Sequence, residues 1–326
     1  MKENLPLAAN KISLEPKPFF SIIMPCFNSE AFLEQSIQSV LAQSEKDFEL
    51  IIVDDGSTDN SVDIVQELAA TDTRIRLSKN QGKSGASGAR NRAADLARGE
   101  WLCFLDSDDK YTTFALGQRK KAISKLPECQ FFSSNFFIWW AADKKVLPQT
   151  VNNPSWFQYF QGGKESGVKI LDQDVVPVFI KHPLAWTGGV TITKSLFERL
   201  GGFDEELIRG EDDHLWIRAS RVSSLVGLIE RADAYYRQRP GSLSLGSASL
   251  SPYTLKMIKK LMDDPLFDDY RLLLKEKLDL EAYLLSLHFR ECGDRLSALR
   301  FALESWLASS FSYRRFRNLI GAALLR

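Results

Sequence analysis

The chain has 326 residues, 44% of them hydrophobic, and its 42 basic residues balance 42 acidic ones. This length exceeds that of most single compact domains, so we expect a core domain with an appended part. The zero net charge gives no argument for a nucleic-acid partner. Four scattered cysteines predict neither a disulfide framework nor a zinc site, and they favour a reducing, cytoplasmic setting. No apolar run reaches the roughly 18 residues that a membrane-spanning helix needs.

The first hundred residues alternate apolar strand patterns with helical ones. Residues 1–18 lack a continuous apolar stretch and are predicted to be a flexible leader rather than a signal peptide. Predicted strands follow at Phe19–Met24, Phe48–Val53, Arg74–Ser78 and from Trp101, each separated from the next by a helical segment. This alternation predicts an α/β fold with a doubly wound, mostly parallel, Rossmann-like sheet. Ligands bind such sheets at the carboxyl ends of the strands, where Pro25, Asp55 and Asp106 should share one crevice.

The later part of the chain is less regular. A helix is predicted over residues 112–125, an aromatic stretch of one or two strands over Phe131–Trp140, and little regular structure over 148–187. Further strands are predicted at Val190–Thr193, Leu225–Glu230 and Ala234–Arg237. From about Pro252 the pattern is wholly helical, so we expect a domain over 19–250 and a helical region over 251–326.

An acidic cluster follows the strand pattern that begins at Trp101, in the sequence WLCFLDSDD. Asp106, Asp108 and Asp109 fall within four positions, and two carboxylates about 5 Å apart repel by roughly 3 kcal/mol at an effective dielectric constant of 20. A cation that offsets this repulsion would be Mg²⁺ or Mn²⁺, which take carboxylates, water and phosphate oxygens. The alternative is an acidic turn that begins a helix, since Asp favours N-caps. The residues alone leave both interpretations open.

Several motifs, taken together, resemble a known family. SIIMPCFNSEAFLEQSIQSVLAQ, VDDGSTDNS, GASGARNRAADLARGEWLCFLDSDD and GGFDEELIRGEDDHLWIR, in this order and spacing, resemble a family 2 glycosyltransferase with the GT-A fold over about residues 21–244. The resemblance implies an inverting, metal-dependent transfer of a sugar from a nucleoside-diphosphate donor, a UDP-sugar, to a hydroxyl of a glycan or glycolipid. Two alternatives remain: a catalytically silent nucleotide-sugar-binding protein, and a D-x-D phosphatase with Asp106 as nucleophile. Lys110 argues against the phosphatase, because such enzymes usually carry Thr or Val there.

The resemblance also assigns residues on the donor side. It implies nucleotide contacts for Pro25, Phe27, Asp55, Arg90 and Asp106. An aspartate suits a base edge because it accepts an N–H bond, although Asp55 in D-D-G-S is alternatively a turn former. Asp106 and Asp108 would hold the Mg²⁺ or Mn²⁺ that neutralises the leaving diphosphate, and Asp109 is expected to cap the next helix. Arg90 is expected in the polar loop before the helix.

A second group of acids lies about a hundred positions later. The resemblance implies Asp212 as general base, with Glu211 as second choice, because inversion needs one carboxylate on the face opposite the leaving group. The alternative is an acid-rich helix start, which the helix dipole favours. Trp186, Gly188 and Gly189 are expected to form the floor of the acceptor pocket. His214 is expected to be an exposed helix residue.

One position departs from the family pattern. Many relatives resemble Y-R-x-H-x-x-S after the base, with a histidine that completes the metal shell, whereas this chain has YYRQRPGSLS with Arg239 in that place. An arginine cannot ligate a cation, so either water fills the position or Arg239 pairs with the diphosphate.

The end of the chain is basic and apolar. Residues 295–326 contain six arginines and one acid, Glu304, among leucines and aromatic residues. Such helices can bind peripherally to an anionic membrane, here its inner face. Alternatively, the apolar stripe packs on the catalytic domain or on a second subunit of a homodimer. Both alternatives stay open.

Overall fold

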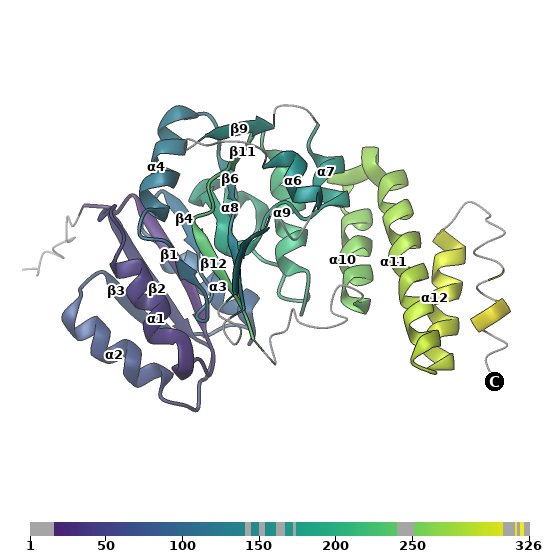
Figure 1. Cartoon of the computed structure of the whole chain (residues 1–326), viewed down its shortest axis with the longest axis horizontal. Helices are drawn as coiled ribbons and strands as arrows, with labels where there is room; N and C mark the ends of the chain where they lie inside the picture. The colour runs from purple at the N-terminus through teal and green to yellow at the C-terminus, as the bar shows by residue number, and fades with distance from the viewer. Residues whose placement is uncertain are drawn as a thin grey trace, which may run out of the picture.

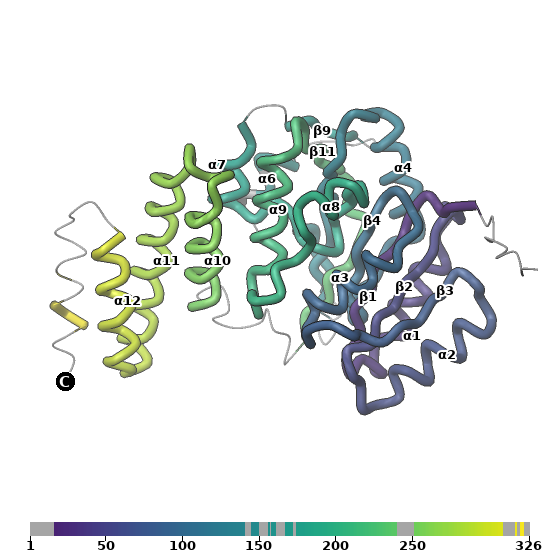
Figure 2. Tube along the Cα trace, turned by 180° about the vertical axis from the view of Figure 1, so that it is seen from behind, coloured from purple at the N-terminus to yellow at the C-terminus, as the bar shows by residue number. Residues whose placement is uncertain are grey.

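A computed structural model describes residues 16–140, 145–149, 154–160, 167–171, 174–239, 251–308, 317 and 320–322. The predicted leader lies outside these residues except for 16–18, and so does the predicted domain end at 250. Figures 1 and 2 show the α/β part at one end of the molecule and the last helices at the other.

The core is an eight-stranded sheet in the order β3-β2-β1-β4-β10-β6-β11-β9. Parallel pairing joins β1 (Phe20–Cys26), β2 (Phe48–Asp54), β3 (Ile75–Lys79) and β4 (Trp101–Phe104). Next, β10 (Val190–Thr193) runs antiparallel between β4 and β6 (Phe131–Ser134), followed by β11 (Val226–Ile229) and the antiparallel edge strand β9 (Val168–Leu171). The mostly parallel α/β sheet is confirmed. β1, β2 and β4 are buried nearly throughout, which explains their continuous apolar sequences.

Helices follow the first strands as expected. The longer ones are α1 (Glu30–Leu41), α2 (Ser61–Thr71), α3 (Ala86–Leu96), α4 (Ala115–Lys125), α8 (Lys194–Leu200) and α9 (Glu211–Val222). Between Pro154 and Gly189 the described residues form three short helices: α6 (Pro154–Tyr159), α7 (Val176–Lys181) and the 3₁₀ turn η1 (Thr187–Gly189). α1 buries Leu33, Ile37 and Val40, whose spacing places them on one face.

A second, four-stranded sheet has the order β5-β12-β7-β8. It consists of β5 (Lys110–Tyr111), β12 (Ala234–Gln238), β7 (Phe137–Trp140) and β8 (Lys145–Pro148). The aromatic stretch predicted over Phe131–Trp140 is therefore divided, with β6 in the large sheet and β7 in the small one. Because β5 directly follows the acidic turn, its partner β12 lies beside that turn.

The C-terminal region is helical, as predicted. α10 (Pro252–Asp263), the 3₁₀ segment η3 (Pro265–Tyr270), α11 (Arg271–Glu291) and α12 (Arg295–Ala308) follow one another, with α11 between α10 and α12 (Figure 1). α10 lies next to α9, and Ser251 caps α10 by accepting a bond from the Tyr253 N–H at 3.3 Å. Each described helix is too short or too polar to cross a bilayer.

Candidate active site

The acidic turn after β4 is held in place by buried hydroxyls. The Oγ atoms of Ser107 and Ser29 lie 2.6 Å apart, and Ser36 Oγ donates to the Ser107 carbonyl at 2.8 Å. These contacts join the turn to α1 and its N-terminal end. Sequence reasoning did not predict these contacts, because single serines in a turn or at the start of a helix carry no pattern that identifies their partners.

Arg90 connects the two groups of acids. Its Nη2 donates to Asp106 Oδ1 at 2.7 Å and its Nη1 donates to Glu211 Oε1 at 2.9 Å. Burial alone would lower the pKa of Arg90, but Asp106 and Glu211 raise it above the ordinary arginine value. Arg90 lies in α3, buried, and not in the preceding loop where it was expected. One guanidinium therefore contacts both acidic groups, which lie close together in space.

The acids of the second group occupy the first turn of α9, where the helix dipole favours negative charge. Asp212 Oδ2 accepts from Thr187 Oγ1 at 3.2 Å, and Asp212 Oδ1 accepts from the Asp213 N–H at 2.9 Å. Burial and the neighbouring Asp212 raise the pKa of Glu211 to about 7, against the opposing effect of Arg90. Desolvation and Asp212 likewise raise the pKa of Asp213 to about 8. Asp212 is thus oriented by Thr187, while Glu211 faces a guanidinium.

The residues expected to form the acceptor floor lie beside Asp212. Thr187, which bonds to Asp212, begins the 3₁₀ turn that contains Gly188 and Gly189. A Cβ on Gly188 would collide with the Trp186 indole, and one on Gly189 would lie 2.7 Å from the Ser134 carbonyl oxygen, so both positions require glycine. The half-buried Trp186 ring packs against Phe136, between β6 and β7, and against Tyr236 of β12.

A buried ion pair supports this turn from behind. Arg119 and Asp233 are fully buried and bonded through Nε and Oδ2 at 2.9 Å, and Arg119 Nη2 donates to the Gly188 carbonyl at 2.8 Å. The pair fixes η1 relative to α4. Sequence reasoning missed it because Arg119 stands in a basic stretch, QRKK, typical of a solvent-exposed helix.

The donor-side residues gather at the carboxyl ends of β1 and β2. Pro25 is half-buried in β1, Phe27 is exposed just beyond it, and the Asp55 N–H donates to the Cys26 carbonyl at 2.8 Å. Asp54, not Asp55, holds the D-D-G-S turn, by accepting from the N–H groups of residues 56 and 57 at 3.2 and 3.1 Å. The Asp55 carboxylate instead accepts from Asn80 Nδ2 at 2.6 Å and from the N–H of residue 85 at 2.7 Å. Asp55 therefore anchors the polar loop over the same strand ends.

Arg237 in β12 and Arg239, directly after this strand, reach the acidic turn. Arg239 donates to Asp108 Oδ2 through Nε at 3.1 Å and Nη2 at 3.0 Å, and Arg237 Nε donates to the Asp108 carbonyl at 2.6 Å. Burial and Asp106 raise the pKa of Asp108, against the opposing effect of Arg239. Asp109 accepts from the Arg237 N–H at 2.7 Å and is buried. The expectation that Asp109 caps a helix was wrong, because the N-cap of α4 is residue 114.

Asp106 and Asp108 fit a divalent cation only together with other ligands. In the part of the chain that the structure describes, no group of three or more His, Cys, Asp or Glu side chains is arranged to hold a metal ion. Mg²⁺ usually takes one or two carboxylates from the protein and completes its shell with water and substrate phosphate. These two carboxylates match that donor set, provided that the phosphates come from the donor.

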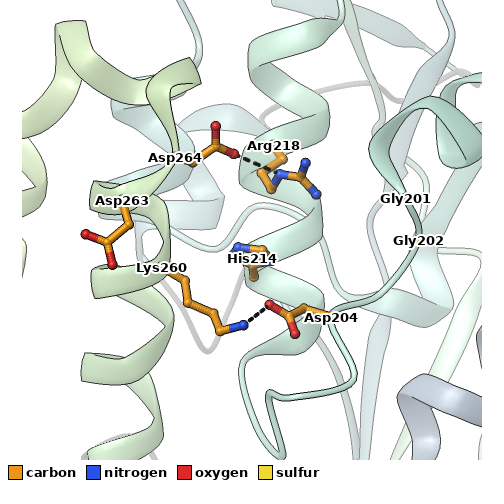
Figure 3. A pocket seen from close by; sticks show the side chains of 8 residues that line it. All are labelled: Gly201, Gly202, Asp204, His214, Arg218, Lys260, Asp263 and Asp264. Carbon is orange, nitrogen blue, oxygen red and sulfur yellow. Dashed lines mark hydrogen bonds and ion pairs between the residues drawn. The ribbon is translucent and has the colours of Figure 1, made fainter. Parts of the chain in front are cut away.

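His214 was expected to be an exposed helix residue, and this expectation was wrong. It is buried, and its Nδ1 has no hydrogen-bond partner among the described residues. It lines a cavity of about 410 Å³ between α9 and α10, which Figure 3 shows with the Lys260–Asp204 and Arg218–Asp264 pairs on either side. Burial and the nearby Arg218 lower the pKa of His214 to about 4, so it is neutral at pH 7. Neither the acids of the turn after β4 nor the acids of the first turn of α9 line this cavity.

Comparisons with known proteins find similarity to glycosyltransferases. A sequence profile described as "Glycosyl transferase family 2" matches residues 21–154. The chain is 30% identical to the Bacillus subtilis "Uncharacterized glycosyltransferase EpsJ" over 235 residues, 70% of this chain and 63% of the relative. It is 39% identical to the Escherichia coli "UDP-Glc:alpha-D-GlcNAc-diphosphoundecaprenol beta-1,3-glucosyltransferase WfaP" over 119 residues, 36% of this chain and 46% of that one. The chain thus spans less than two thirds of the length of these relatives.

Among solved structures, S. aureus TarS in complex with UDP superposes with a TM-score of 0.64, covering 93% of this chain and 88% of that one. The sequence identity is 19%, so this likeness concerns the fold. The GT-A fold expected from the sequence is confirmed.

Proposed function

The chain belongs to glycosyltransferase family 2 through its residues 21–154, and from this we propose that it transfers a sugar from a UDP-sugar to a hydroxyl of a glycan or lipid-linked glycan, with inversion. The observation that carries the proposal is the Arg90 bridge between Asp106 and Glu211. Through Arg90, the acidic turn, which could hold the cation of a diphosphate, lies one side chain away from the acidic start of α9, which could supply a general base. The donor and the lipid-linked acceptor are supported by the printed name of WfaP, and the donor also by the UDP bound to TarS.

On the donor side, we assign the nucleotide to the ends of β1 and β2. Phe27 offers an exposed ring for packing against the base, and Pro25 lies two residues before it. The Asp55 carboxylate, free of the turn that Asp54 holds, can accept an N–H of the base edge. Its bonds to the loop at residues 80–85 would then couple loop position to donor binding.

At the diphosphate, we assign Asp106 and Asp108 to a Mg²⁺ or Mn²⁺ ion, which when bound would supply charge that offsets the leaving nucleoside diphosphate. Arg90 holds Asp106 in position. Arg239 already lies on Asp108 and presents its guanidinium where the phosphates would arrive, in accord with pairing between Arg239 and the diphosphate.

For the transfer itself, we assign the general base to Asp212. Its carboxylate would take the proton of the acceptor hydroxyl while the new bond from oxygen to the anomeric carbon forms and the bond to the diphosphate oxygen breaks. Thr187 fixes the orientation of Asp212 beside Trp186, where the acceptor would lie. Glu211 remains the second choice, because its bond to Arg90 favours the ionised form and already uses one of its two carboxylate oxygens.

The test is an assay of the purified full chain with a panel of UDP-sugars and GDP-mannose, with Mn²⁺ or with EDTA. Donor binding is measured separately by thermal shift, since a ligand that binds the native state raises the melting temperature. Asp212→Asn should lower kcat by about 10²–10⁴-fold, the usual contribution of general-base catalysis. Asp63→Asn, an exposed acid on α2, is the matched control and should keep full activity. Full activity of Asp212→Asn would remove Asp212 from the mechanism.

A further inference from the structure

The C-terminal helices line a groove that contains none of the residues assigned above to the transfer. The groove, of about 390 Å³, lies between α10, α11 and α12. Its apolar lining includes Leu278, Leu303 and Leu307, and its basic residues are Lys259, Lys275 and Arg300. It thus combines hydrocarbon contacts with positive charge in one place.

The groove continues onto an apolar face of α12. Leu296, Leu303 and Leu307 are 82%, 44% and 69% exposed, and their spacing places them on one side of the helix with Arg300 among them. The other side of α12 is packed, because Ala298 and Ala302 are buried in a cluster with Ala322. A row of exposed leucines on one face, unlike scattered surface leucines, indicates a contact surface.

The charges of the groove identify the chemistry of its occupant. Lys259 forms an ion pair with Glu304. Among the described residues, no ion pair neutralises Lys275 or Arg300. Two uncompensated cations beside an apolar lining match an amphiphile with a hydrocarbon chain and an anionic head. A second copy of this chain is a poorer match, since a two-fold contact would bring two basic rims together.

We propose that this groove binds an acyl chain of an anionic phospholipid, with Lys275 and Arg300 on the lipid phosphate, and so docks the protein on a bilayer. The exposed leucines of α12 insert into the interfacial region, as the apolar faces of interfacial helices do. The docking depends neither on the donor nor on the acidic site. It goes beyond the proposed transfer and would bring the catalytic domain to the surface where lipid-linked acceptors lie.

The test is co-sedimentation of the full chain with vesicles of phosphatidylcholine, with or without phosphatidylglycerol. Binding should require phosphatidylglycerol and weaken in high salt, because surface charges are screened. Lys275→Glu and Arg300→Glu should each weaken binding by about fivefold or more, the effect of losing one basic residue near an anionic surface. The double variant Leu303→Gln with Leu307→Gln should abolish it.

Matched controls separate the groove from the general surface. Leu280→Gln changes an exposed leucine on the far side of α11, and Lys121→Glu reverses an exposed charge on α4; both should bind vesicles like the unaltered protein. The proposal is overturned if the protein binds vesicles without phosphatidylglycerol as strongly as vesicles with it. It is also overturned if the two control variants lose as much vesicle binding as the groove variants. If the unaltered protein does not bind vesicles but self-associates in analytical sedimentation, and the leucine variant does not self-associate, the groove belongs to a homodimer interface instead. Vesicle binding by a protein that transfers no sugar would refute the proposed function and leave this proposal standing.

Discussion

Replacing Arg90 by alanine removes the guanidinium that lies between the two acidic groups. The side chains of Arg90, Glu211 and Asp106 are 6%, 14% and 30% exposed, so the arginine and the glutamate are largely shielded from water. Breaking a buried ion pair by removing one partner costs about 3–5 kcal/mol, since the other charge stays buried without compensation. Asp106 keeps contact with water, so most of the cost comes from Glu211. We expect Arg90→Ala to lower the free energy of unfolding by about 3 kcal/mol near neutral pH.

The cost should depend on pH in a defined direction. Burial and Asp212 raise the pKa of Glu211 to about 7, and Arg90 opposes them, so the variant's Glu211 has a still higher pKa. A carboxyl whose folded pKa lies above its unfolded value binds more protons in the folded state, so its contribution to stability falls as pH rises between the two values. The loss caused by Arg90→Ala should therefore be larger at about pH 8 than at about pH 5.5, where Glu211 can take up a proton.

Urea unfolding of the full chain at both pH values measures this cost. Arg74→Ala is the matched control: Arg74 pairs with Asp72 at 2.6 Å near the surface, and such pairs contribute at most about 1 kcal/mol. An Arg90→Ala cost equal to that of the control, or one that does not change with pH, would show that the acids do not depend on this arginine.

Three further changes test the surroundings of the site. Thr187→Val removes the bond to Asp212 and should lower kcat by about fivefold, the contribution of one hydrogen bond. Steady-state kinetics should show an unchanged KM for the donor, and a variant in which only KM changes would contradict the assigned role of Thr187. Arg239→Ala frees Asp108 and should tighten Mn²⁺ binding by about tenfold, as measured by electron paramagnetic resonance of the ion. Weaker Mn²⁺ binding would show that Arg239 and the ion do not compete for Asp108. Arg119→Met leaves a buried carboxylate unpaired and should cost about 3–5 kcal/mol in thermal unfolding, whereas an unchanged melting temperature would refute its structural role.

The sequence predicted best the strands that are buried along their whole length. β1, β2 and β4 were predicted close to their observed bounds, because strands buried on both faces consist almost entirely of apolar residues. The small sheet was not predicted as a separate unit. β5 has two residues, and the aromatic residues of β7 continue without a break from those of β6, so nothing local marks where the chain leaves one sheet for the other.

The acids of the site were predicted, but the arginines that pair with them were not predicted as their partners: Arg90 was expected at the nucleotide and Arg239 at the diphosphate. Arg90 and Arg119 lie in polar stretches of sequence, and each is buried beside an acid more than a hundred positions away, Glu211 for Arg90 and Asp233 for Arg119. One signal was available, since Arg237 in β12 and Arg239 directly after it stand two residues apart, the spacing that points side chains to the same side of an extended chain. Both in fact reach the same acidic turn.

These arginines change the reason for expecting a metal ion. Neighbouring carboxylates repel each other and were therefore expected to need a cation. In the structure, the ion pairs of Arg90 with Asp106 and of Arg239 with Asp108 already supply positive charge from the protein. The fold therefore does not need Mg²⁺ or Mn²⁺ to tolerate its acidic turn, and a divalent ion would be needed only when a diphosphate adds further negative charge. EDTA should accordingly leave the melting temperature of the donor-free protein unchanged and abolish the stabilisation by UDP. A melting temperature that falls in EDTA without any nucleotide would show that the ion is part of the folded structure and that the arginines do not suffice.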